Sequence, residues 1–474
     1  MELDLIQEMI KQVLEEIKEE GVEVSSKEEY GYGVFDSMVE AIDASEKAQK
    51  ELFECSVQQR DKFVDAIRAE ILKKENLEMI SYDAVEETKI GRVEDKIIKN
   101  RVAAENTPGT EDLKTRAITG EDGLTIEEYC PFGVIGSITP TTNPTETLIN
   151  NSISMIAGGN TVVFSPHPRA KKVSIKLVKM MNKALEEAGA PRNLITMVKE
   201  PSIENSKIMM ESPKVRLLVA TGGPAIVKQV LSAGKKAIGA GAGNPPVVVD
   251  ETADIEKAAK DIVSGASFDN NVPCIAEKEV FAVESVVDQL IYYMKKNGAY
   301  EITSPEVLEQ LDKAVSKENG KPNPSLVGKS AKELLALVGI NVEDDIKLVI
   351  ARTNKDHHLV TEEMLMPILP IVSVSDVDTA IDWAYEAEAG NRHTAIMHSK
   401  NVDKLTKMAK KLEATIFVKN APSYAGIGVG GEGHTTFTIA GPTGEGITSA
   451  KSFCRIRRCV MSEALSIREL ALTP

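Results

Sequence analysis

The sequence predicts an α/β protein built from two lobes, each with a largely parallel sheet. Beyond Val134, apolar runs of strand length alternate with amphipathic runs of helix length, the pattern typical of right-handed βαβ units. A second set of the same kind begins at Pro246. The 474 residues, 42% of them hydrophobic, are enough to bury a large core. We therefore expect helices on both faces of each sheet.

The elements of each lobe can be assigned in chain order. In the first lobe the predicted strands are 134–139, 160–165, 194–198, 215–220 and 236–240, and the predicted helices are 145–157, 169–188, 203–211 and 224–232. In the second lobe the predicted strands are 246–250, 279–283, 346–351, 369–374, 394–398 and 415–420, with a helix over 254–267 and further helices between the later strands. The intervening glycine-rich run 239–246 has permissive backbone and is expected to join the lobes.

The N-terminal region differs from the rest of the chain. Residues 1–20 carry apolar side chains at helical spacing over an otherwise charged face, which predicts an amphipathic helix. Residues 21–33 are polar and contain glycine, so they read as a linker. The residues alone leave open whether the helix packs back on the main domain or docks on another protein.

Charge and cysteine content narrow the class of protein. The 56 basic and 72 acidic residues give a net charge of −16, and no long basic run favours nucleic acid or an anionic membrane as partner. Five cysteines form no CxxC pair and six histidines show no ligand-like spacing, so we expect a reducing cytosol and no metal site. We expect neither a secretory signal nor a membrane span.

Cys274 is the strongest candidate for chemistry. It lies in the polar, proline-containing turn 267–278, between the predicted helix 254–267 and an apolar strand. A thiol near backbone N–H dipoles in such a turn can hold a depressed pKa and react as thiolate. The alternative is that Cys274 is a small buried hydrophobic residue, as most cysteines are.

Two further turns follow strands of the first lobe. Thr221-Gly222-Gly223 precedes Pro224 at a helix start, where backbone N–H groups can bind phosphate, although a plain βα turn fits equally well. Asn143 also stands between a strand and a helix. Its amide could stabilise an oxyanion together with the Cys274 backbone N–H, or it could cap the helix.

Seven motifs together resemble those of a known family. They are ITPTTNPTET, TVVFSPHPRA, LLVATGGPAIV, GAGAGNPPVVVD, SFDNNVPCIAEK, EEMLMPILPIV and TIFVKNAPSYAGIG, in that order along the chain. From about residue 35 to about residue 460 the chain resembles the CoA-acylating aldehyde dehydrogenases, particularly the propionaldehyde, acetaldehyde and butyraldehyde enzymes of bacterial microcompartments. The resemblance implies the aldehyde dehydrogenase fold, with a Rossmann-like NAD-binding domain at 34–242 and a catalytic domain at 243–430. It also implies a small oligomerisation sheet, formed by a strand near 123–130 and one in the return segment 431–474.

The same resemblance assigns roles to residues. Cys274 would be the nucleophile, Asn143 the oxyanion donor, and Glu363 would hold the nicotinamide ribose. Pro168 stands where many NAD-dependent relatives carry a ribose-binding glutamate. The other motifs of the resemblance favour NAD. The other residues implied in cofactor binding are Thr139, Pro140, Thr141, Ser165, His167, Thr221, Gly222, Gly223, Gly241, Ala242 and Gly243.

One departure from hydrolytic relatives bears on the reaction. Their Glu-Leu-Gly-Gly motif, which activates water, is replaced here by the glycine-rich residues 241–246. An acyl-enzyme that resists hydrolysis can instead transfer its acyl group to coenzyme A. The resemblance therefore implies that a short-chain aldehyde, CoA and NAD+ give acyl-CoA and NADH through a Cys274 thioester, with ping-pong kinetics.

Two alternatives stay open at this stage. A hydrolytic aldehyde or semialdehyde dehydrogenase differs only by the missing glutamate, and an inactive microcompartment scaffold would use the N-terminal helix alone. Residues 1–20 resemble the peptides that carry such enzymes into microcompartments. The expectation is therefore a cytoplasmic homodimer or homotetramer, inside a bacterial microcompartment, that contacts shell proteins through this helix.

Overall fold

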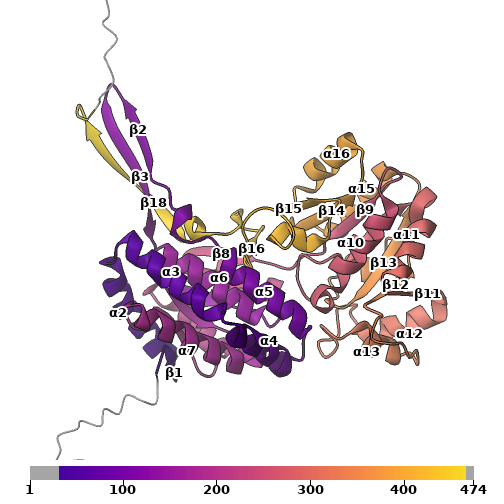
Figure 1. The fold of residues 1–474 in the computed structure, drawn as a ribbon, viewed down its shortest axis with the longest axis horizontal. Coiled ribbons are helices and arrows are strands. Elements are labelled where there is room, and N and C mark those ends of the chain that lie inside the picture. The colour runs from indigo at the N-terminus through magenta and orange to yellow at the C-terminus, as the bar shows by residue number, and fades with distance from the viewer. Residues whose placement is uncertain (1–30, 466–474) are drawn as a thin grey trace, which may run out of the picture.

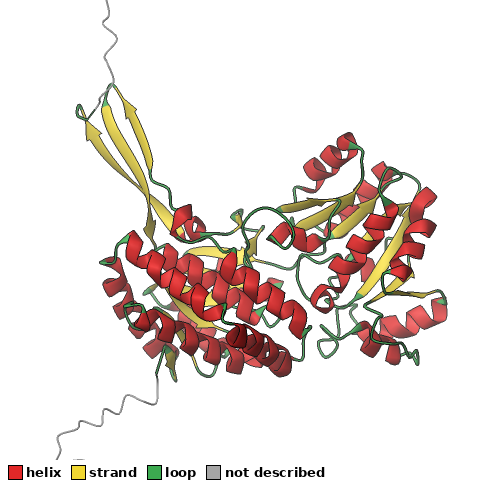
Figure 2. Cartoon of the chain, in the orientation of Figure 1, coloured by secondary structure: helices red, strands yellow, loops and turns green. Residues whose placement is uncertain are grey.

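The computed structural model describes residues 31–465, which form two α/β lobes and a projecting three-stranded sheet (Figure 1, Figure 2). The predicted helix at 1–20 and most of the linker lie outside the described residues. None of the helices between residues 31 and 465 combines the length and hydrophobicity needed to cross a membrane.

The first lobe contains a six-stranded parallel sheet in the order β1-β6-β5-β4-β7-β8. Its strands are β1 (Val34–Phe35), β4 (Val134–Ile138), β5 (Thr161–Ser165), β6 (Ile195–Val198), β7 (Val215–Thr221) and β8 (Lys236–Ala240). Its helices are α2 (Met38–Phe53), α3 (Val57–Ile71), α4 (Lys74–Thr88), α5 (Val93–Glu105), α6 (Pro144–Ala157), α7 (Lys171–Glu187), α8 (Ile203–Glu211) and α9 (Pro224–Leu231). The five predicted strands are confirmed, and only the short edge strand β1 was not predicted.

Successive residues of these strands enter different cores, which confirms that helices cover both faces. Ile135 and Val162 pack in the core formed with α6 and α7, whereas Val134 and Val163 pack in the core formed with α2, α8 and α9. Strands buried on both faces read as continuous apolar runs, as observed here.

The second lobe contains a seven-stranded parallel sheet in the order β11-β12-β13-β10-β9-β14-β15. Its strands are β9 (Pro246–Val249), β10 (Glu279–Val283), β11 (Ala299–Ile302), β12 (Leu348–Arg352), β13 (Ile368–Val374), β14 (Thr394–His398) and β15 (Ile416–Lys419). Its helices are α10 (Ile255–Ser267), α11 (Glu284–Lys296), α12 (Pro305–Val315), α13 (Ala331–Ala336), α14 (His358–Thr361), α15 (Val377–Glu388) and α16 (Val402–Leu412). Only the edge strand β11 was not predicted from the sequence.

The third sheet is antiparallel and projects from the first lobe (Figure 1). It consists of β2 (Arg116–Gly120), β3 (Gly123–Pro131) and β18 (Cys454–Ser462). The pairing of β3 with β18 agrees with the two strands that the resemblance implied. Ile456 and Val460 on β18 are 62% and 60% exposed, which leaves apolar side chains uncovered on this sheet.

Residues 241–245 connect β8 of the first sheet to β9 of the second. The chain then returns to the first lobe, where β16 (Ile439–Ala440) contacts β8 and pairs with β17 (Gly446–Ile447). The boundary between residues 242 and 243 stays a prediction, and it falls inside this connection.

Candidate active site

A cavity of about 710 Å³ lies where the carboxyl ends of β4, β5 and β7 meet loops of the second lobe. Cys274 and Glu363 line it from the second lobe, and Asn143 lines it from the first. Gly243 does not line the cavity. The other predicted site residues all do: Thr139, Pro140, Thr141, Ser165, His167, Pro168, Thr221, Gly222, Gly223, Gly241 and Ala242.

The loop before Cys274 has an unusual backbone. Asp269, Asn270 and Asn271 have φ values of 49°, 54° and 64°, so three consecutive residues are left-handed. Aspartate and asparagine tolerate this region better than other non-glycine residues. The sequence Asp-Asn-Asn therefore permits a sharp bend after α10, which brings the partly exposed Cys274 to the cavity.

Side chains of this loop hold the bend in place. Asn270 Nδ2 donates to the Gly328 carbonyl at 2.9 Å, and Asn271 Nδ2 donates to the carbonyls of Ala266 at 2.8 Å and Glu277 at 2.9 Å. The buried Lys278 ammonium adds bonds to Asn271 O, Asn271 Oδ1 and Pro273 O, at 2.8, 2.7 and 3.3 Å. These hydrogen bonds hold the loop 269–274 in its bent conformation.

The electrostatics of Cys274 oppose ionisation. Burial and, to a smaller extent, the carboxylate of Glu363 raise the pKa of the thiol to about 12, against the opposing effect of the Lys278 ammonium. Burial likewise raises the pKa of Glu363, against the effect of Lys278. The expectation of a depressed thiol pKa is therefore wrong, because the apolar surroundings outweigh the dipoles of the turn.

The side chain of Asn143 does not cap a helix. Asn143 is the N-cap residue of α6 but makes no side-chain capping bond. Its Oδ1 instead accepts a hydrogen bond from Lys99 Nζ at 2.6 Å, and the one bond of its Nδ2 is a long contact of 3.4 Å with Thr142 Oγ1. The capping alternative is thus excluded, and the amide N–H groups are available to the cavity.

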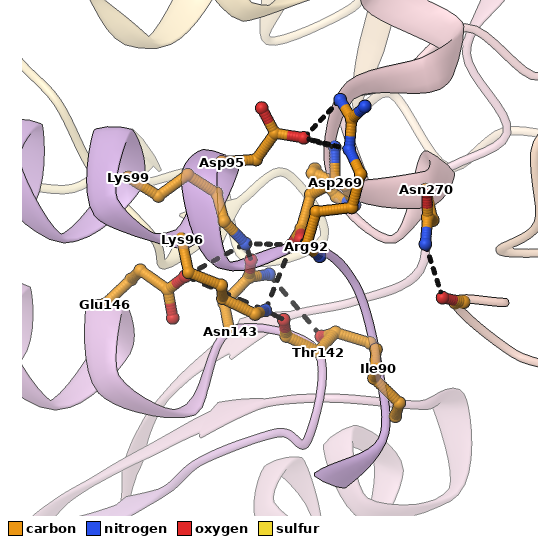
Figure 3. Close-up of polar contacts among 12 residues, drawn as sticks. Ile90, Arg92, Asp95, Lys96, Lys99, Thr142, Asn143, Glu146, Asp269 and Asn270 are labelled. Carbon is orange, nitrogen blue, oxygen red and sulfur yellow. Dashed lines mark hydrogen bonds and ion pairs between the residues drawn. The ribbon is translucent and has the colours of Figure 1, made fainter. Parts of the chain in front are cut away.

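A buried cluster of four charged residues stands behind Asn143 (Figure 3). Lys99 Nζ lies 2.6 Å from Asp269 Oδ2 and 2.9 Å from Glu146 Oε1, and Lys96 Nζ lies 3.0 Å from Asp269 Oδ2. All four side chains are fully buried. Despite burial, Lys96 and Lys99 hold the pKa of Asp269 below its usual value.

Sequence reasoning missed this cluster. Lys96, Lys99 and Ala103 form a buried stripe on α5 at helical spacing, but a stripe that contains two lysines reads as a solvated helix face. The small residue Ala103 was the only signal of burial there.

The other wall of the cavity is formed by the β7–α9 turn. Gly223, the N-cap of α9, offers no side-chain cap, and a Cβ atom there would meet nothing within 4 Å. Gly222, Ala225 and Ile226 also line the cavity, so the N-terminal backbone of α9 is open to it. A pyrophosphate fits this arrangement of open N–H groups and helix dipole.

Several lining residues on this wall were not anticipated. They include Ile203, which is 86% exposed and sits at the start of α8. An exposed isoleucine beside a cavity offers a flat apolar surface to a ring, but the sequence shows only an ordinary helix start. Also missed were Ser202, Ser206, Gln229, Val272, Leu365 and Phe437.

Gly243 packs directly against the backbone of Cys274. Its N–H donates to Glu363 Oε1 at 3.4 Å, and a Cβ atom there would lie 2.6 Å from the Cys274 carbonyl oxygen and 2.9 Å from His393 Cγ. Any larger residue would displace one of these groups.

His393 itself was not singled out from the sequence. Burial, with a smaller effect from Lys278, lowers its pKa to about 4, so the ring is neutral at pH 7. Its Nδ1 bonds Thr394 Oγ1 at 2.8 Å, while its Nε2 is buried without a partner.

One group of possible metal ligands occurs within residues 31–465, namely Asp312, His357 and His358. His358 Nε2 lies 2.5 Å from Asp312 Oδ1 and 2.8 Å from Ser316 Oγ, so these side chains bond one another. None of them lines the cavity.

Comparison with known proteins agrees with this geometry. Residues 35–454 match the model of the aldehyde dehydrogenase family. The chain is 51% identical over 439 residues to a propanal dehydrogenase (CoA-propanoylating) of Salmonella typhimurium, covering 92% of this chain and 94% of the relative.

Two solved structures are also similar. A Rhodopseudomonas palustris propionaldehyde dehydrogenase with bound CoA and an acylated cysteine has a TM-score of 0.92 and 61% identity, covering 92% of this chain and 100% of that chain. A propionaldehyde dehydrogenase from the Clostridium phytofermentans fucose utilisation bacterial microcompartment has a TM-score of 0.90 and 52% identity, again covering 92% and 100%. The chain therefore belongs to the aldehyde dehydrogenase family.

Proposed function

We propose that this protein is a CoA-acylating aldehyde dehydrogenase that converts a short-chain aldehyde, CoA and NAD+ to acyl-CoA and NADH. The observation that carries the proposal is the composition of one cavity. Cys274 and Asn143 line it together, and Gly241 also lines it, in the segment that by resemblance replaces the glutamate motif of hydrolytic relatives. Among the described lining residues Glu363 is the one carboxylate.

In the first half of the reaction, Cys274 attacks the aldehyde carbonyl. The sulfur forms a bond to carbon while the carbonyl oxygen gains negative charge. The N–H groups of Asn143 and the backbone N–H of Cys274 stabilise that oxygen as a pair of preorganised donors. Because the thiol is largely neutral, its S–H bond breaks as the sulfur–carbon bond forms, and the proton passes to solvent at the partly exposed Cys274.

Residues of both walls hold the nucleotide. The open α9 N-terminus suits the pyrophosphate, and Glu363 suits a ribose hydroxyl. When bound, the nicotinamide accepts hydride from the carbon attached to Cys274, which leaves a thioester. NAD+ is preferred over NADP+ in this proposal, because no lysine or arginine lines the cavity to pair with a 2′-phosphate.

In the second half, the thiol of CoA attacks the thioester and Cys274 leaves as thiolate. His393 Nε2, a neutral and unpaired nitrogen on the far side of Gly243, accepts the thiol proton. Val272, Leu365 and Phe437 give the cavity an apolar lining suited to a short alkyl group. Together with the relatives, this favours propionaldehyde, followed by acetaldehyde and butyraldehyde.

The test is NADH formation from propionaldehyde and NAD+ with and without CoA, in the wild type and Cys274→Ala. Strict dependence on both CoA and Cys274 is expected. NADH formation without CoA would instead establish the hydrolytic alternative, and nucleotide binding without turnover would establish the inactive scaffold.

Assembly forms a second part of the proposal. The uncovered apolar side chains of β18 suit a homodimer or homotetramer, and residues 1–20 suit docking to microcompartment shell proteins. The relative from a fucose utilisation microcompartment supports this location. Deletion of residues 1–20 should leave activity intact and abolish co-purification with shells. Loss of activity on deletion would contradict the targeting role.

A further inference from the structure

We infer that Lys99 and Lys278 act as a pair of positioning residues, each of which strengthens one of the two oxyanion donors. Each ammonium donates to the carbonyl oxygen of an amide whose own N–H points to the reaction: Lys99 to the Asn143 side chain, and Lys278 to the Pro273–Cys274 peptide. The inference rests on the proposed function, because it concerns the same reaction.

Lys99 fixes the orientation of the Asn143 side-chain amide. An ammonium has three donors and no acceptor, so it can face only Oδ1. The flipped amide would place N–H groups against Nζ at a distance of 2.6 Å. The Nδ2 group is therefore left as the donor toward the cavity, whether or not a substrate is present.

Lys278 acts on the second donor through the backbone. Its Nζ bonds the Pro273 carbonyl at 3.3 Å, and the same carbonyl accepts from Ala276 N–H at 3.0 Å. The N–H of that peptide bond belongs to Cys274. Two donors on one carbonyl polarise the amide, which makes its N–H a stronger donor in turn.

Both lysines lie in buried surroundings where a charge is costly, which argues against simple packing. Lys99 is fully buried and retains Asp269 and Glu146 as counter-ions, and together these outweigh the effect of burial and raise its pKa. Lys278 is buried as well, and burial lowers its pKa against the opposing effect of Glu363 and other neighbouring acidic groups. A charge-assisted bond is roughly twice as strong as a neutral one, so each ammonium polarises its amide more than a neutral donor would.

Lys96 provides a matched control. It lies one helical turn from Lys99 on α5, is equally buried, and pairs with the same Asp269 (Figure 3). Its Nζ, however, donates to the Thr142 carbonyl at 2.6 Å. The amide it polarises is that of the Asn143 backbone, which is not an oxyanion donor.

The experiment measures the carbonyl of the acyl-enzyme directly. Wild type, Lys99→Met, Lys278→Met and Lys96→Met are acylated with propionyl-CoA that carries ¹³C at the carbonyl, without nucleotide. The thioester C=O stretch is recorded by isotope-edited infrared difference spectroscopy, and acylation is followed by mass spectrometry. Should Lys99→Met fail to fold, the charge-balanced Lys99→Met/Glu146→Gln variant replaces it.

The expected result is a shift of the stretch to higher wavenumber in Lys99→Met and Lys278→Met, because weaker donors polarise the carbonyl less. The rate of acylation by propionyl-CoA should fall about 10-fold to 100-fold in both, less than the roughly 10²- to 10³-fold loss when a donor itself is removed. Lys96→Met should keep the wild-type stretch.

Two outcomes separate this inference from the function on which it rests. A wild type that forms no acyl-enzyme would overturn both. Normal acylation with the same stretch in all four proteins, or an equal shift in Lys96→Met, would overturn the pairing alone and reduce the lysines to structural ion-pair partners.

Discussion

The two walls of the cavity differ in the kind of groups they present. The wall formed by β5, α8 and the β7–α9 turn offers backbone and small or apolar side chains, and His167 is its one ionisable lining residue. The wall around Cys274 concentrates buried charge, with Glu363 in the cavity and Lys99, Lys278 and Asp269 behind it. One wall is suited to hold a ligand by shape, and the other to stabilise charge that changes during the reaction.

The two walls of the cavity therefore have different roles, one mainly in nucleotide binding and the other mainly in the chemical step. Apart from Glu363, which is proposed to bind the nucleotide ribose, substitutions on the charged wall should alter kcat, and substitutions on the other wall should alter nucleotide affinity. The following predictions test that division, from the largest effect to the smallest.

Replacement of Cys274 should lower kcat and leave nucleotide affinity unchanged. Cys274→Ala should lose at least about 10⁴-fold in kcat, since loss of a covalent nucleophile removes the acyl-enzyme pathway. Nucleotide affinity, measured by NADH fluorescence, should stay at the wild-type value. A parallel loss of nucleotide binding would show that the two walls are not independent.

Removal of the side-chain oxyanion donor should have the next largest effect. Asn143→Ala should lower kcat roughly 10²- to 10³-fold with little change in KM, because the donor acts on charge that develops in the transition state. Steady-state kinetics with propionaldehyde measure both constants. A raised KM with unchanged kcat would assign Asn143 to ground-state binding instead.

Two neighbours of Cys274 should shift its ionisation in opposite directions. Lys278 lowers the thiol pKa of about 12 and Glu363 raises it, so Lys278→Met should raise this pKa and Glu363→Gln should lower it. Below the pKa, the thiolate fraction changes about tenfold per unit of pKa. The rate of iodoacetamide alkylation between pH 7 and pH 10 provides the measurement.

The control for this pair is Cys274→Ala, which should show no alkylation at this site. Wild-type alkylation should still be rising with pH at the top of the range. Shifts of both variants in the same direction would mean that the substitutions act through loop structure rather than through charge.

The smallest predicted effect is that of replacing His167, on the wall formed by β5, α8 and the β7–α9 turn. Burial, with Arg169, lowers the pKa of His167, whose Nδ1 accepts from the Arg169 N–H at 3.2 Å. His167→Ala should weaken NAD+ binding about fivefold, equivalent to about 1 kcal/mol of lost contact, and leave kcat unchanged. Calorimetric titration with NAD+ measures the affinity. A fall in kcat would mean that His167 contributes to the chemical step.

The sequence was sufficient for features that depend on local pattern. Cys274 and Asn143 each follow or precede a strongly periodic element, so their turns could be located before any contact was known. The edge strand β1 was missed because a two-residue strand such as Val34–Phe35 carries too few side chains to show a period.

Features that depend on distant partners could not be found in this way. Lys99 and Asp269 are 170 positions apart, and neither shows locally that it is buried. The same reason explains the wrong expectation for Cys274. The polar residues around Cys274 can be read from the sequence. The burial that raises its pKa arises only when the lobes assemble.

Asp269 belongs to the second lobe, whereas its two lysine partners lie on α5 of the first, so the ion cluster joins the lobes beside the nucleophile. Separation of the lobes at this point would break the buried ion pairs between Asp269 and the two lysines, so the cluster favours the joined arrangement of the lobes. The protein should therefore behave as one rigid body around Cys274.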